Sequence, residues 1–223
     1  MIYRRPPEDL PDLAAQRAAL AGKLTETIAE AVISSHPPDR LYGLVLEYGE
    51  GGVYPTAAAL FEAARRHLLG GGEEPHPPWT GSDRTDLWHG LWDPTWAEPE
   101  DYLPEGVDPA PYDREAMEDD VQRPFEAKPE LSRAFLEYQR TGALVDRDGG
   151  HSAVNALWWE VAVRLTQLDW KGRLDITDDF VVLAYPIASS RGDDIRAALE
   201  HSLTPARFAE LEAKGWIPGP EEL

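Results

Sequence analysis

The chain contains no cysteine. Disulfides, thiolate nucleophiles and zinc sites built on cysteine are therefore excluded. Long apolar runs are also missing, because no stretch approaches the roughly 18 residues that a membrane-spanning helix needs. No apolar stretch follows Arg4 and Arg5 near the N-terminus, so the sequence has no secretory signal pattern. We expect a cytoplasmic protein.

Basic residues are scarce. The chain has 21 Lys and Arg against 41 Asp and Glu, which gives a formal charge of −20. Such a surface repels nucleic-acid phosphates and anionic lipids. We therefore expect no nucleic-acid or membrane partner, and we expect attraction to a basic protein. Solubility alone is the alternative explanation of the charge. The sequence leaves the oligomeric state open.

The common motifs of catalysis and cofactor binding are absent too. The glycine clusters at 49–52 and 70–72 lack the Lys and Ser or Thr of a phosphate loop. The loop that starts at Asp146 resembles half of a calcium loop, but His151 and Leu157 stand where glycine and glutamate are required. No histidine pair has metal-ligand spacing. We predict no cofactor, no metal site and no catalytic residue from motifs.

Hydrophobic residues make up 42% of the 223 positions, enough for a core. The spacing of apolar residues and the positions of helix-breaking Pro and Gly predict helices at 12–35, 129–142, 153–169 and 195–202. A last helix is predicted from Pro205 to Gly215. A further helix is expected to start after Thr56. Strands are predicted at 41–48, 53–54 and 180–185, after a turn at 175–179. This order does not alternate regularly, so we expect an α+β fold: one domain over 1–223, with a small, mainly antiparallel sheet and helices packed on it.

Residues 73–128 form a Pro- and Trp-rich acidic insertion in this fold. Four of the eight tryptophans lie in it, and Glu98 to Asp120 contains ten acids and one base. Buried tryptophans would pin such a segment to the core. We expect Arg84–Trp92 to form a helical turn packed on the core, and residues 99–120 to be irregular and exposed.

Two aromatic sites stand out. His89 lies among tryptophans with carboxylates on either side, which favours either a binding pocket with a general base or an aromatic staple with an exposed polar face. Trp158 falls on the core face of its helix. Trp159 is turned about 100° from it, so it either packs beneath the insertion or makes an exposed contact.

Two stretches resemble a known bacterial family. Leu41 to Tyr48, followed by Val53-Tyr54-Pro55-Thr56-Ala57, is similar to the opening strand, turn and helix of the domain of unknown function 4303 family. Phe180 to Tyr185 and the run Leu203 to Phe208 are similar to its closing strand and helices. The resemblance covers about half of the chain, leaves out the insertion, and implies no catalytic residues.

The sequence thus supports a protein-binding module, most concretely an immunity- or antitoxin-like protein that neutralises a basic partner through an acidic, Trp-containing face. The analogy comes from small α+β families that act in this way, and fold alone does not imply function. The alternative is a hydrolase or transferase that uses carboxylates and His89, with or without a divalent metal, on a small molecule. The predicted partner-binding residues are Trp88, His89, Trp92, Trp96, Glu98, Glu100, Asp101, Glu118, Asp119, Asp120 and Trp159.

Overall fold

The amphipathic N-terminal helix is α1 (Leu13–Ser35), and Asp12 caps it by accepting hydrogen bonds from the amides of Ala14 and Ala15. The computed structural model describes residues 12–49, 55–68, 91–92, 103, 105–112, 114–145, 151–186 and 192–217. The elements that follow α1 are β1 (Leu41–Tyr48), β2 (Thr56–Phe61), α2 (Glu62–Leu68), η3 (Ala110–Tyr112), α5 (Arg114–Glu126), α6 (Pro129–Val145), α7 (His151–Thr166), β3 (Ile176–Pro186), α8 (Gly192–Ser202) and α9 (Pro205–Ala213).

The three strands form one sheet in the order β2-β1-β3. β1 pairs antiparallel with β2 and parallel with β3, so Leu46 lies between Ala57 and Ala184. The sheet is therefore mixed, and the antiparallel arrangement expected from the sequence holds for one of its two strand pairs. The α+β class, with helices packed on a small sheet, is confirmed.

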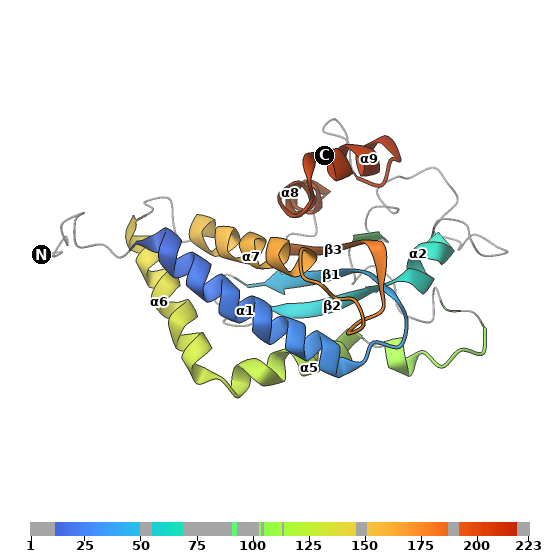
Figure 1. The fold of residues 1–223 in the computed structure, drawn as a ribbon, viewed down its shortest axis with the longest axis horizontal. Helices are drawn as coiled ribbons and strands as arrows, with labels where there is room; N and C mark the ends of the chain where they lie inside the picture. The colour runs from blue at the N-terminus through green and yellow to red at the C-terminus, as the bar shows by residue number, and fades with distance from the viewer. Residues whose placement is uncertain are drawn as a thin grey trace, which may run out of the picture.

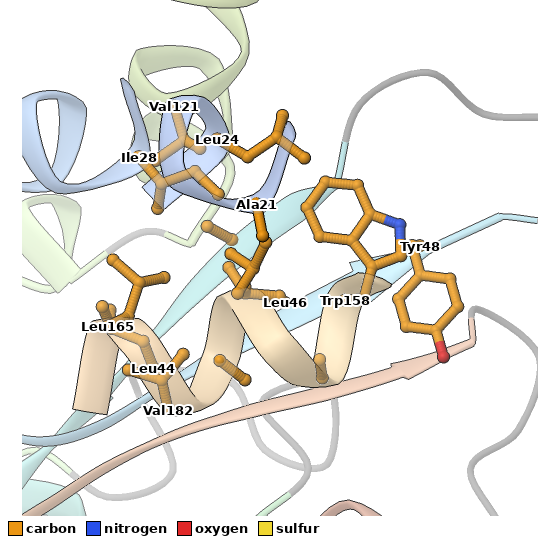
Figure 2. Packing of buried hydrophobic residues seen from close by; sticks show 14 of the residues in the cluster. Ala21, Leu24, Ile28, Leu44, Leu46, Tyr48, Val121, Trp158, Leu165 and Val182 are labelled. Atoms are coloured by element: carbon orange, nitrogen blue, oxygen red, sulfur yellow. The ribbon is translucent and has the colours of Figure 1, made fainter. Parts of the chain in front are cut away.

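Helices cover both faces of the sheet (Figure 1). α1 and α7 pack on one face, and α5 and α6 extend this layer. α8 and α9 pack on the other face, together with Leu91 and Trp92. Because both faces are buried, β1 is apolar along almost its whole length. We call the core between the sheet and the layer of α1 and α7 the first core. Figure 2 shows it, with Leu24 and Ile28 of α1 beside Leu44 and Leu46 of β1 and Trp158 of α7.

The segment after Thr56 corrects the sequence prediction. It is strand β2, and the helix begins only at Glu62. Three consecutive alanines favour a helix by intrinsic propensity, but here they pair with β1, and Ala57 and Ala58 are buried. Tertiary pairing overrides the local preference. The strand predicted at 53–54, the glycine turns at 50–52 and 70–72 and the loop at 146–150 lie outside the described residues.

The insertion is more helical than predicted. Residues 99–120 were expected to be irregular, but α5 begins at Arg114 and η3 precedes it. Val121 and Phe125, one turn apart, are buried in the first core and fix α5 there. Of the turn predicted at 84–92, Leu91 and Trp92 lie within the described part of the chain, and both are helical and buried.

The C-terminal elements match the predictions closely. α6 and α7 confirm the two predicted helices, with α7 starting at His151 and ending at Thr166. Strand β3 begins at Ile176, so the predicted turn at 175–179 is mostly strand. α8 begins at Gly192, earlier than the predicted start at 195, so Asp193 and Asp194 lie in its first turn. α9 begins at Pro205 as predicted, and Thr204 caps it.

Candidate functional site

Polar side chains gather where the parallel strands β1 and β3 end, the edge at which open α/β sheets bind ligands. Glu47 is the register neighbour of Thr56 on one side and of Tyr185 on the other. The Tyr185 hydroxyl donates to Glu47 Oε1 at 3.3 Å, and the Thr56 hydroxyl lies 3.5 Å from Glu47 Oε2. The Glu47 carboxylate is thus held in place across all three strands.

The next residue, Tyr48, points to the opposite face because side chains alternate along a strand. Its ring stacks on Trp158 of α7 with centroids 5.9 Å apart, and its hydroxyl donates to Asn155 Oδ1 at 2.9 Å. Phe135 of α6 contacts the same indole, with centroids 6.0 Å apart. The carboxyl end of β1 is thereby joined to the N-terminal half of α7, as Figure 2 shows for Tyr48 and Trp158.

Trp159, a predicted partner-binding residue, covers the outer edge of β3. Its indole donates to the Ala184 carbonyl at 3.2 Å, and its ring stacks on His201 of α8 at 3.8 Å. Further along α7, the Thr166 hydroxyl accepts a hydrogen bond from the Val182 amide at 2.9 Å. α7 therefore satisfies two backbone groups that an edge strand would otherwise offer to another chain.

An ion-pair network ties α2 and α9 to strand β3. Asp179 Oδ2 accepts from Arg65 at 2.7 Å and from Arg207 at 2.9 Å, which joins β3, α2 and α9. Burial works to raise the pKa of Asp179, but the hydrogen bond from Arg65 and the charges of Arg65 and Arg207 outweigh it and lower that pKa. Asp179 is therefore a carboxylate at neutral pH, a weak base that serves as an anchor.

A second carboxylate between two arginines joins α1 and α7. Glu160 of α7 accepts from Arg17 of α1 at 2.9 Å and from Arg164 at 2.7 Å. Among the described residues, no group of three or more His, Cys, Asp or Glu could hold a metal ion. Asp179 and Glu160 are each held by two guanidinium groups.

Trp92 is wrongly predicted as a surface contact. It is 3% exposed, its indole donates to the Trp216 carbonyl at 2.6 Å, and its ring meets Tyr42 edge-on. The interpretation of 84–92 as an aromatic staple explains this position better, because the buried indole fixes Trp92 to the core that α8 and α9 form with the sheet.

The predicted acids lie only in part within the described chain. Asp119 is exposed on α5, and the neighbouring Asp120 pairs with Arg123 at 3.0 Å. Glu118 lies on the same helix, but its side chain is not among those that the structure describes. The remaining predicted residues fall outside the described part of the chain: Trp88, His89, Trp96, Glu98, Glu100 and Asp101.

The sequence interpretation missed the residues at the carboxyl edge. Glu47 could have indicated a site at this edge, because it is the one charged residue in the apolar run from Leu41 to Tyr48. Asn155 carried no comparable signal, since a polar residue on an amphipathic helix is ordinary. Its relation to Tyr48 depends on a contact across 107 positions of sequence.

No protein-family model, curated protein or solved structure matches the chain. Membership of the domain of unknown function 4303 family therefore stays a prediction. Among the helices described, none is long and apolar enough to cross a membrane.

Proposed function

We propose that this protein is a protein-binding module whose acidic surface binds a basic partner protein. The concrete form of the proposal is an immunity- or antitoxin-like protein in the cytoplasm. It is supported by the net charge of −20 and by the ten acids between Glu98 and Asp120. Complementary charge accelerates encounter and selects the partner.

One structural observation carries the proposal furthest. The acidic segment runs into α5, which is held against the core by Val121 and Phe125 while Asp119 on the same helix is exposed. The last acids of the segment thus belong to an element with a fixed position. A fixed charge loses less conformational entropy on binding than a charge on a flexible chain.

The test neutralises these acids and compares the result with the same change of charge elsewhere. The test variant carries Glu118→Gln, Asp119→Asn and Asp120→Asn. The control carries Glu26→Gln, Glu130→Gln and Glu137→Gln, three exposed acids on α1 and α6. Both variants and the wild type serve as bait in lysate of the source organism at low and moderate salt, with quantitative mass spectrometry.

We expect one basic protein whose recovery falls with salt, falls several-fold with the α5 variant, and changes little with the control. Equal loss with both variants would show that the net charge matters and the α5 surface does not. Unchanged recovery with both would mean that these acids do not mediate binding.

A further inference from the structure

We draw no further inference here: the strongest candidate, the exposed surface patch of Glu105, Val107 and Asp108 in the loop before α5, belongs to the acidic surface already proposed to bind a partner, and nothing in the described part of the chain shows what covers it.

Discussion

At the residue scale, Asp179 is a partly buried charge that joins β3 to two helices. It binds guanidinium groups from two separate helices, and its side chain is 25% exposed. Removing the charge of Asp179 takes one partner from each arginine, and Arg65 and Arg207 keep only Glu62 and Glu210 among the described residues. We expect Asp179→Asn to lower the free energy of unfolding by about 1–3 kcal/mol at pH 7, measured by urea denaturation. Asp175→Asn is the control, because the Asp175–Arg40 pair is exposed and should be worth less than about 1 kcal/mol.

The pH dependence of the same variant has a definite sign. The pKa of Asp179 is lowered in the folded protein, so its contribution is complete above the unfolded-state pKa, about 3.9. That contribution is lost as the pH falls through the folded-state pKa. The stability difference between wild type and Asp179→Asn should therefore narrow below about pH 4. A difference that stays constant over this range would show that the charge of Asp179 is not what stabilises the network.

Two buried indoles provide a second comparison between residues. Trp158→Phe and Trp170→Phe remove similar ring volume, but only Trp170 loses a hydrogen bond, the one to the Leu165 carbonyl. We expect Trp170→Phe to be the more destabilising change by about 1 kcal/mol in chemical denaturation. If Trp158→Phe lowered the free energy of unfolding as much as Trp170→Phe or more, the Trp158 indole would also donate a hydrogen bond in solution.

At the scale of elements, the outer edge of β3 depends on α7. Thr166→Val keeps the shape of the side chain but removes the acceptor of the Val182 amide. We expect a loss of about 1–2 kcal/mol and hydrogen exchange of the Val182 amide that is about tenfold faster. Thr25→Val is the control, because among the described residues the Thr25 hydroxyl donates to the Ala21 carbonyl within α1 and contacts no strand amide. Unchanged exchange at Val182 would mean that the edge is protected by other means.

The contact between α6 and α7 is close enough to require a glycine. A Cβ atom at Gly142 would lie 2.6 Å from the Cβ of Ala153, whereas one at Gly22 in α1 would meet only the end of the Arg164 side chain at 3.4 Å. Alanine favours helices over glycine by about 1 kcal/mol. We expect Gly22→Ala to raise the melting temperature and Gly142→Ala to lower it. A rise with both would show that α6 and α7 can separate without cost.

Some helices and strands could be predicted from the sequence, and others could not. α1, β1 and α9 were recognisable because each has apolar spacing bounded by a strong signal: Asp12, the proline pair after His36, and Thr204-Pro205. β2 was not recognisable, because alanines carry a helical preference and no alternation. α5 was hidden by its acids and by Pro124, and only the pair Val121 and Phe125 indicated a buried face.

At the scale of the molecule, the sheet brings distant segments together. β1 and β3 are parallel neighbours although more than a hundred residues separate them, and no local pattern encodes that pairing. The carboxyl-edge residues therefore emerge only from the fold. The distribution of charge, in contrast, can be read directly from the sequence. The described side chains are closer to balance, and most of the acidic excess belongs to residues outside them, where the sequence alone locates it.

The salt dependence of partner binding tests the central proposal most directly. The basic protein captured by the wild type is purified, and its affinity is measured by calorimetry from low to moderate salt. Our account predicts tight binding that weakens steeply as salt screens the acidic surface. Binding that is insensitive to salt, or a captured partner that is not basic, would contradict it.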